Sequence, residues 1–272
     1  MEYDPTIYLG SAAYYLRGRP PYSSELEATL ASLVPLDGRG RLLDVGCGPG
    51  VLATRLAPYV QSVVAVDPDA DMLAEGKRNA AQAGIGNIEW IRARGEDLAT
   101  LGLGTFRLAT FGQSFQWMER ERVAELIFDM LEPDGAIVLL AHTVEGRPVP
   151  QGPGPPPIPH ASIRAIIDRF LGTKRRAGQG FTPTQPDRYA DALARTRFGR
   201  PTIVFAPGRT DLVQDVDGVL ANYLSMSFCA PHLFGARLDE FCAAVRAALE
   251  PLSPDGRFWD WPGDTEILIA RR

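Results

Sequence analysis

The chain has 272 residues, 45% of them hydrophobic, and a formal net charge of −5 at neutral pH. This composition supports a globular core, and the interspersed charges, with no basic run longer than Lys174–Arg176, argue against a nucleic-acid partner. Cys47, Cys229 and Cys242 lack the spacing of a metal site. No apolar run approaches the roughly 20 residues that span a bilayer, and the N-terminus resembles no signal peptide. We therefore expect a cytoplasmic protein with no metal and no membrane partner.

Strands and helices are predicted to alternate along the first half of the chain. A capping box at Ser24–Glu27 predicts a helix that ends near Val34, before Pro35. Apolar runs predict strands at 41–45, 62–66, 87–92, 106–111 and 135–141, and amphipathic stretches predict helices at 49–57, 69–83 and 119–131. This alternation favours a parallel sheet with helices on both faces.

The second half changes in composition. Residues 146–159 are dense in Pro and Gly, which excludes a helix or a central strand there. We interpret this stretch as a surface excursion, with a flexible linker and a partner-docking segment as alternatives. Helices are predicted near 160–171, 187–196, 213–226 and 236–249, and late strands near 202–205 and 267–270.

The segment from Arg41 to Gly50 is the most informative in the chain. It predicts a buried strand, a glycine-rich turn and the start of a helix. Glycines at 46, 48 and 50 remove every Cβ that could block a ligand from the backbone, and they permit positive φ angles. The helix that follows offers unpaired N–H groups to a polar ligand. Because ligands of open α/β sheets bind beyond the strand C-termini, we expect a binding crevice here.

The spacing of this turn separates possible ligands. The strand 62–66 is followed by Asp67, about 20 residues after the first glycine, as in sites that bind ribose hydroxyls. The glycines fall as G-x-G-x-G, whereas dinucleotide sites have G-x-G-x-x-G. Asp44, two residues before the first glycine, would repel phosphates and suits a ligand that carries an ammonium or sulfonium group.

These segments resemble the class I S-adenosylmethionine (SAM) dependent methyltransferases of the small-molecule type, over roughly residues 10–142. The first family motif matches Asp44, Gly46, Gly48 and Gly50, and the second matches Asp67. The resemblance implies SAM as cofactor and S-adenosylhomocysteine (SAH) as product. It places Met72 on the adenine, Glu96 or Asp97 at the adenine edge, and Arg19 with Tyr15 at the methionyl carboxylate. The further implied cofactor contacts are Cys47, Pro68, Gly95, Phe111 and Phe115.

The resemblance also implies the architecture. It predicts an α/β fold with a seven-stranded, mostly parallel Rossmann-like sheet whose last strand is antiparallel. The two late strands would pair antiparallel at one sheet edge. Within a single domain of residues 1–272, residues 36–142 would form the SAM-binding core. Residues 143–200 and 207–262 would then form insertions that cap the substrate over the C-terminal edge.

Methyl transfer from a sulfonium is an in-line displacement, so the protein must mainly align the acceptor with the methyl group. A hydroxyl or protonated amine acceptor also requires a general base. His142, at the end of a strand, and His232 are the candidates, each with a purely structural role as alternative; His160 is interpreted as an exposed residue near a helix start. Trp117, Tyr223 and Phe228 are candidate substrate contacts, which favours an apolar or aromatic acceptor.

Three other functions stay open. A SAM-binding protein of this fold could catalyse cyclisation or decarboxylation. A protein or nucleic-acid methyltransferase is disfavoured, because Gly112–Phe115 stands where many amino-group methyltransferases carry Asn/Asp-Pro-Pro-Tyr/Phe. A nicotinamide oxidoreductase would instead bind NAD(P). The sequence decides neither the acceptor atom nor the oligomeric state.

Overall fold

A seven-stranded sheet forms the centre of the computed structural model, which describes residues 4–143, 154–181 and 187–272. The strand order is β3-β2-β1-β4-β5-β11-β8. The strands are β1 (Arg41–Val45), β2 (Ser62–Asp67), β3 (Ile88–Arg92), β4 (Phe106–Gly112), β5 (Leu131–His142), β8 (Thr202–Ala206) and β11 (Thr265–Arg271). Strands β1 to β5 pair in parallel, and β11 is antiparallel to both β5 and β8. The predicted Rossmann-like sheet with an antiparallel last strand is therefore confirmed.

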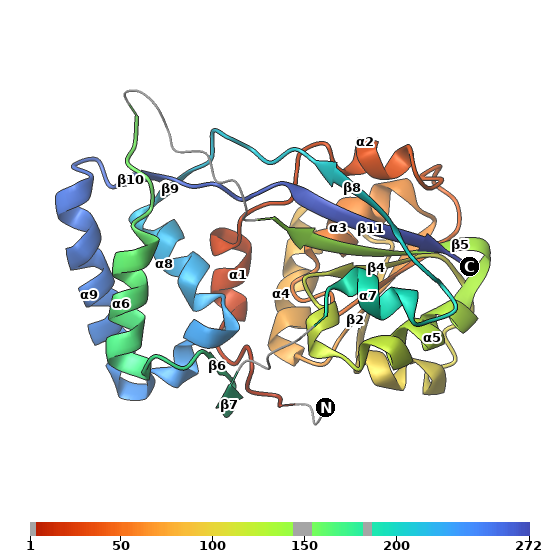
Figure 1. Ribbon diagram of the computed structural model, residues 1–272, viewed down its shortest axis with the longest axis horizontal. Helices are drawn as coiled ribbons and strands as arrows, with labels where there is room; N and C mark the ends of the chain where they lie inside the picture. Colours follow the sequence, from red (N-terminus) through yellow and green to blue (C-terminus); the bar gives the residue numbers. More distant parts are fainter. Residues whose placement is uncertain (1–3, 144–153, 182–186) are drawn as a thin grey trace.

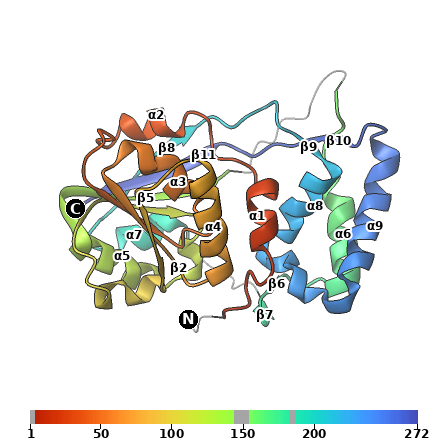
Figure 2. The ribbon, with the colours of Figure 1, turned by 180° about the vertical axis from the view of Figure 1, so that it is seen from behind.

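Helices cover both faces of the sheet, as the sequence predicts (Figures 1 and 2). The helices α2 (Leu26–Ala31), α3 (Val51–Leu56) and α4 (Ala70–Gln82) share one core, and α5 (Arg120–Met130) and α7 (Tyr189–Ala194) share the other. Successive strand residues point to opposite faces, so Leu42 packs in the first core and Leu43 in the second. Both cores thus hold the C-terminal ends of the strands in fixed positions.

Four helices form a separate unit with its own hydrophobic core, which we call the helical unit. They are α1 (Ala12–Gly18), α6 (His160–Leu171), α8 (Val216–Leu224) and α9 (Leu238–Leu249). Figure 1 shows this unit beside the sheet, facing the C-terminal end of β5. Its core contains an aromatic cluster in which Phe241 stacks on Phe234 at 4.1 Å and meets Phe170 edge-on at 5.7 Å.

Two predicted segments and one helix that was not predicted differ from the expected arrangement. Residues 213–215 form β9 (Val213–Asp215), which pairs antiparallel with β10 (Arg257–Trp259), so the helix predicted from 213 begins at 216. Helix α7 packs on the sheet through Ala192 and Leu193. This part of the predicted 143–200 insertion therefore lies outside the helical unit. Helix α1, which precedes the predicted insertions, does belong to that unit and packs along α8.

The proline-rich stretch is described only from residue 154 onward; its residues 146–153, and with them part of the linker and docking alternatives, lie outside the described residues. The described part pairs with β10, because Ile158 N donates to the Trp259 carbonyl and Trp259 N to the Pro156 carbonyl. A short hairpin of β6 (Arg176–Ala177) and β7 (Gly180–Phe181) follows α6. Across the ranges that the structure covers, every helix is too short or too polar to cross a bilayer.

Candidate functional site

The glycine turn after β1 has the predicted left-handed backbone. The φ angles of Gly46, Gly48 and Gly50 are 66°, 53° and 73°. A Cβ at Gly46 would lie 2.5 Å from the Ser114 Cβ, whereas a Cβ at Gly48 would meet no atom within 4 Å. Gly46 therefore permits close approach of the loop after β4, and Gly48 leaves space beside the turn.

Gly50 has a different role from the predicted ligand contact. A Cβ there would lie 2.3 Å from the ring of Trp90, and Gly50 lines neither of the two pockets described below. It is the N-cap of α3, and its left-handed backbone starts that helix. The prediction that Gly50 contacts the cofactor is thus not supported by its position.

Two buried carboxyl groups flank the turn. Asp67 accepts hydrogen bonds from Gly48 N at 2.8 Å and from Asp69 N at 2.9 Å. Asp44 accepts from Thr110 Oγ1 at 2.8 Å and from Ala53 N at 3.1 Å. Burial outweighs these hydrogen bonds and raises the pKa of Asp67 to about 6 and that of Asp44 to about 7. A positively charged ligand beside Asp44 would favour its ionised form.

A pocket of about 100 Å³ lies on one side of the turn. The predicted residues that line it are Tyr15, Gly46, Gly48, Asp67, Pro68, Met72, Gly95 and Glu96. The pocket separates the two acids that the sequence left open, because Glu96 lines it while Asp97 is exposed outside it. Glu96 is held by Glu119 N, which donates to it at 3.1 Å, and by Arg94 at 3.4 Å.

Three aromatic residues occupy other places than predicted. Trp117, expected at the substrate, lines this smaller pocket and meets Tyr8 edge-on at 6.0 Å. Phe111 and Phe115, expected at the cofactor, are each 1% exposed and pack in the sheet core. Their side chains point to the face that α5 covers, so they line neither pocket.

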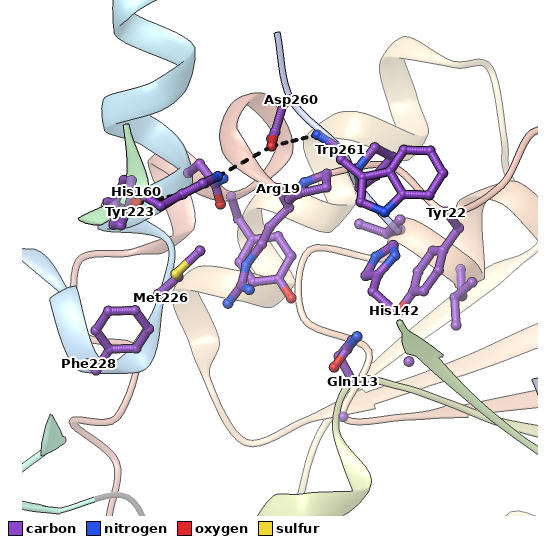
Figure 3. Close-up of a pocket in the computed structure, with 18 of the residues that line it drawn as sticks. Arg19, Tyr22, Gln113, His142, His160, Tyr223, Met226, Phe228, Asp260 and Trp261 are labelled. Carbon is purple, nitrogen blue, oxygen red and sulfur yellow. Dashed lines mark hydrogen bonds and ion pairs between the residues drawn. The ribbon is translucent and has the colours of Figure 1, made fainter. Parts of the chain in front are cut away.

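A second cavity of about 500 Å³ lies between the sheet edge and the helical unit (Figure 3). The two spaces share Tyr15, Gly46, Gly112 and Gln113. Seven predicted residues other than glycines line the larger one: Tyr15, Arg19, Asp44, Cys47, His142, Tyr223 and Phe228. The fold thus brings the glycine turn, the N-terminal arm and α8 together around one cavity.

Of the two histidines predicted as bases, only His142 lines the larger cavity. His142 lines the larger cavity, stacks on Tyr22 at 4.8 Å, and has no hydrogen-bond partner at Nδ1 among the described residues. Burial, together with the positive charge of Arg19, lowers its pKa to about 4. His232 lines neither pocket, and its Nδ1 donates to the Leu9 carbonyl oxygen at 3.1 Å. His232 is therefore not among the residues that line the cavity, which leaves it without the position expected of the base.

The sequence analysis missed a third histidine that lines the cavity. His160, the first residue of α6, has its Nδ1 2.8 Å from the Tyr223 hydroxyl and its Nε2 3.7 Å from Asp260 Oδ1. Asp260 is 3% exposed and accepts a hydrogen bond from Gln214 Nε2 at 2.9 Å. A hundred residues separate His160 from Asp260, and the pairing of β10 with the segment before α6 joins them. No local pattern could have indicated this contact.

Arg19 lies at the centre of the cavity (Figure 3). Its Nη2 donates to the Ser225 carbonyl at 2.9 Å, and its guanidinium lies 4.9 Å from the Tyr15 ring centroid. Its buried Nε has no partner in the part of the chain that the structure covers. The guanidinium is thus positioned by α8 and retains hydrogen-bonding capacity for an anion.

Comparison with known proteins agrees with this geometry. Residues 42–135, which include the glycine turn and Asp67, match the family model described as a methyltransferase domain. CRG1 of Saccharomyces cerevisiae, named a probable S-adenosylmethionine-dependent methyltransferase, is 27% identical over 134 residues, 48% of this chain and 46% of that protein. Rv3342 of Mycobacterium tuberculosis, named an uncharacterized methyltransferase, is 30% identical over 145 residues, 53% of this chain and 56% of that protein. The chain spans about half the length of the curated relatives it matches.

Solved structures share the fold over most of the chain. Precorrin 8w decarboxylase from Methanobacterium thermoautotrophicum is 15% identical with a TM-score of 0.50, and covers 94% of both chains. The YcgJ protein from Bacillus subtilis is 13% identical with a TM-score of 0.51, and covers 90% of this chain and 97% of that one. Residues 42–135 thus match a methyltransferase domain, and this match together with the order and direction of the seven strands supports a class I S-adenosylmethionine-dependent methyltransferase.

Proposed function

We propose that this protein transfers a methyl group from SAM to a small organic acceptor bound in the larger cavity. The observation that carries this proposal is that two pockets at the C-terminal edge of the sheet share part of their lining. The smaller contains the glycine turn and Asp67, the larger lies under the helical unit, and they meet at Gly46 and Gln113. A cavity of about 500 Å³ matches the size of small-molecule sites.

The residues around the turn fit the cofactor. Gly48 has open space where a Cβ would stand, beside the buried carboxyl of Asp67, which would receive the ribose hydroxyls. Met72 and Glu96 would hold the adenine, and the unpartnered Nε of Arg19 suits the methionyl carboxylate. When bound, SAM supplies an electrophilic methyl group on a sulfonium. Asp44 places a carboxyl group on the cavity wall, where it favours that positive charge.

The larger cavity favours an acceptor with an apolar or aromatic part. Tyr223, Met226, Phe228 and Trp261 line it, and the helical unit covers it from the side opposite the sheet. A concave site of about 500 Å³ that is lined from both sides suits a small molecule better than a long protein or nucleic-acid segment. The methyltransferases among the relatives support transfer of a methyl group rather than decarboxylation.

We assign proton removal to His160. With Nε2–H facing the carboxylate of Asp260, Nδ1 accepts the hydrogen of the Tyr223 hydroxyl. A proton from the acceptor then moves to the Tyr223 oxygen as the Tyr223 proton moves to His160. The negative charge of Asp260 stabilises the imidazolium that forms. His142 is less suited to this role, because a pKa near 4 makes it a weak base at neutral pH.

The first prediction concerns the reaction and its base. The purified chain should form SAH from SAM with at least one member of a panel of phenols, aromatic amines and aromatic acids. His160→Gln should lower kcat by about 10²- to 10⁴-fold with an unchanged Kd for SAH, because general base catalysis contributes about that much. His142→Gln is the comparison within the same cavity and should lower kcat by less than His160→Gln.

Calorimetry and SAH quantification separate the alternatives. If SAM and SAH fail to bind, the assignment of the smaller pocket is wrong. If SAM binds but the protein decarboxylates or cyclises a substrate without SAH formation, the cofactor assignment is correct and the proposal of methyl transfer is wrong. If His142→Gln impairs kcat more than His160→Gln, the two histidines exchange roles.

A further inference from the structure

The described wall of the larger cavity has more arginine side chains than carboxyl groups. Three guanidinium groups line it, those of Arg19, Arg164 and Arg175. The carboxyl groups on the described part of the wall belong to Asp44 and Asp260. Both accept hydrogen bonds from neutral donors, and the structure shows no ion pair between either of them and an arginine of the cavity. On the described wall, neither of these carboxyl groups neutralises an arginine of the cavity through an ion pair.

The three arginines differ in what they already bind. Arg19 donates to the Ser225 carbonyl and is the residue that we assign to the cofactor. Arg164 Nε donates to the Asp168 carboxylate at 2.8 Å. Arg175 has no hydrogen bond and no ion pair with any residue in the ranges 4–143, 154–181 and 187–272. Within the described residues, Arg175 is thus the one of the three whose side-chain donors have no hydrogen-bond partner.

Arg175 is nevertheless held in place. Its guanidinium carbon lies 4.2 Å from the centroid of the Phe228 ring, and that of Arg164 lies 5.6 Å from the same centroid. Stacking on an aromatic face orients a guanidinium while leaving the in-plane N–H groups free. Phe228 itself lies on the cavity wall, on the side of α8 (Figure 3).

The electrostatic surroundings of Arg175 favour an anion. Burial, and then the like charges of Arg164 and Arg19, lower the pKa of Arg175. An anionic ligand would relieve this repulsion. A planar carboxylate matches the fork of one guanidinium with two parallel hydrogen bonds, whereas a phosphate dianion calls for a second free cation.

We infer that the acceptor carries a carboxylate next to an apolar or aromatic body, with the carboxylate bound by Arg175 and the body packed on Phe228. This inference rests on the proposed function, since it names the substrate class of the same cavity. Arg175 is a specificity residue here and takes no part in breaking or forming the methyl bond.

Calorimetry on the SAH-loaded protein tests the inference with matched probes. Benzoate, 4-hydroxybenzoate and phenylacetate are compared with their amides and with phenyl phosphate. At least one acid should bind about tenfold or more tightly than its amide, as expected for one charged hydrogen-bonded contact. Arg175→Gln should remove this preference, and Arg175→Lys should restore part of it, because lysine keeps the charge without the fork.

Lys174→Gln is the matched control. It removes the same charge one residue away, from a side chain that lies over Phe181 outside the cavity. The acid preference should survive this change.

The inference is overturned if acids and amides bind equally, if none of the acids binds, or if the preference persists in Arg175→Gln. Tighter binding of phenyl phosphate than of benzoate would assign the cavity to phosphate esters instead. Loading with SAH is titrated first, so a failure of the cofactor site is seen separately from a failure of the carboxylate contact.

Discussion

At the scale of single residues, burial decides the protonation of the acids beside the glycine turn. Asp44 is 1% exposed and Asp67 8%, and each accepts two hydrogen bonds from neutral donors. Those hydrogen bonds favour the ionised carboxylates. The effect of desolvation is larger than theirs, and it raises both pKa values above the usual 3.8. The ionised acids therefore destabilise the free folded protein, and its unfolding free energy should fall as pH rises from about 4 to about 7.

The second prediction follows from Asp67. Ribose hydroxyls donate to a carboxylate, so binding of SAH requires the ionised form and releases a proton when pH is below about 6. The Kd for SAH should rise on acidification through pH 6, approaching tenfold per pH unit. Calorimetry between pH 5 and pH 8 measures this slope. Asp67→Asn should bind more weakly and without the slope, and a pH-independent Kd in the unmodified protein would contradict the assignment of Asp67.

At the scale of elements, contact between α1 and α8 sets one wall of the larger cavity. Tyr15 and Arg19 come from α1 and the residue after it, and Asn222 and Tyr223 come from α8. The helices approach closely because Gly18 has no side chain. A Cβ at Gly18 would lie 2.1 Å from the Ala221 carbonyl carbon. The sequence analysis predicted no helix at residues 12–18. The contact of α1 with α8 joins segments about 200 residues apart, which a local pattern does not reveal.

The third prediction uses this contact. Alanine favours an isolated helix over glycine by about 1 kcal/mol, so Gly18→Ala would be stabilising if propensity alone decided. The clash with the α8 backbone should dominate and lower the unfolding free energy by about 1–3 kcal/mol. Gly86→Ala is the control, since a Cβ there meets nothing within 4 Å. Urea unfolding of both variants measures the difference, and an unchanged or raised stability of Gly18→Ala would refute close helix contact.

At the scale of the whole molecule, the sheet cores support the cofactor pocket, and the core of the helical unit supports the larger cavity. The cores on the sheet hold the glycine turn, Asp67 and Glu96, whereas the aromatic core of the helical unit holds α6 and α8. The smaller pocket depends mainly on the sheet, and the larger cavity needs both. Cofactor binding and acceptor binding should therefore respond differently to damage in the helical unit.

The fourth prediction separates these tasks. Phe241→Ala removes a fully buried ring from the aromatic cluster and should lower the unfolding free energy by about 3–5 kcal/mol. The Kd for SAH should change less than turnover does, since the sheet cores hold the glycine turn, Asp67 and Glu96. Turnover of the acceptor should fall strongly. Phe241→Leu keeps most of the packing and serves as the milder variant. Equal losses of SAH binding and of turnover in Phe241→Leu would contradict the separation of cofactor binding from acceptor binding.

The sequence by itself determined the features that arise from short segments. The alternation of apolar runs predicted the strands β1 to β5, β8 and β11, and the glycines predicted the turn and the left-handed backbone at 46, 48 and 50. The spacing after the glycine turn indicated Asp67, and the family resemblance placed Met72 at the adenine and left Glu96 and Asp97 as alternatives at the adenine edge. Such features depend on interactions within one strand–helix unit, which a periodic pattern records.

Only the tertiary structure decided which distant residues share the larger cavity. His160 and Asp260 meet through a strand pairing, Arg175 reaches Phe228 across the helical unit, and His232 lies away from the wall. The same holds for Phe111, whose alternation on β4 is clear while its burial under α5 is not. These outcomes come from packing between units far apart in the chain, and the pattern within each unit carries no information about its partner.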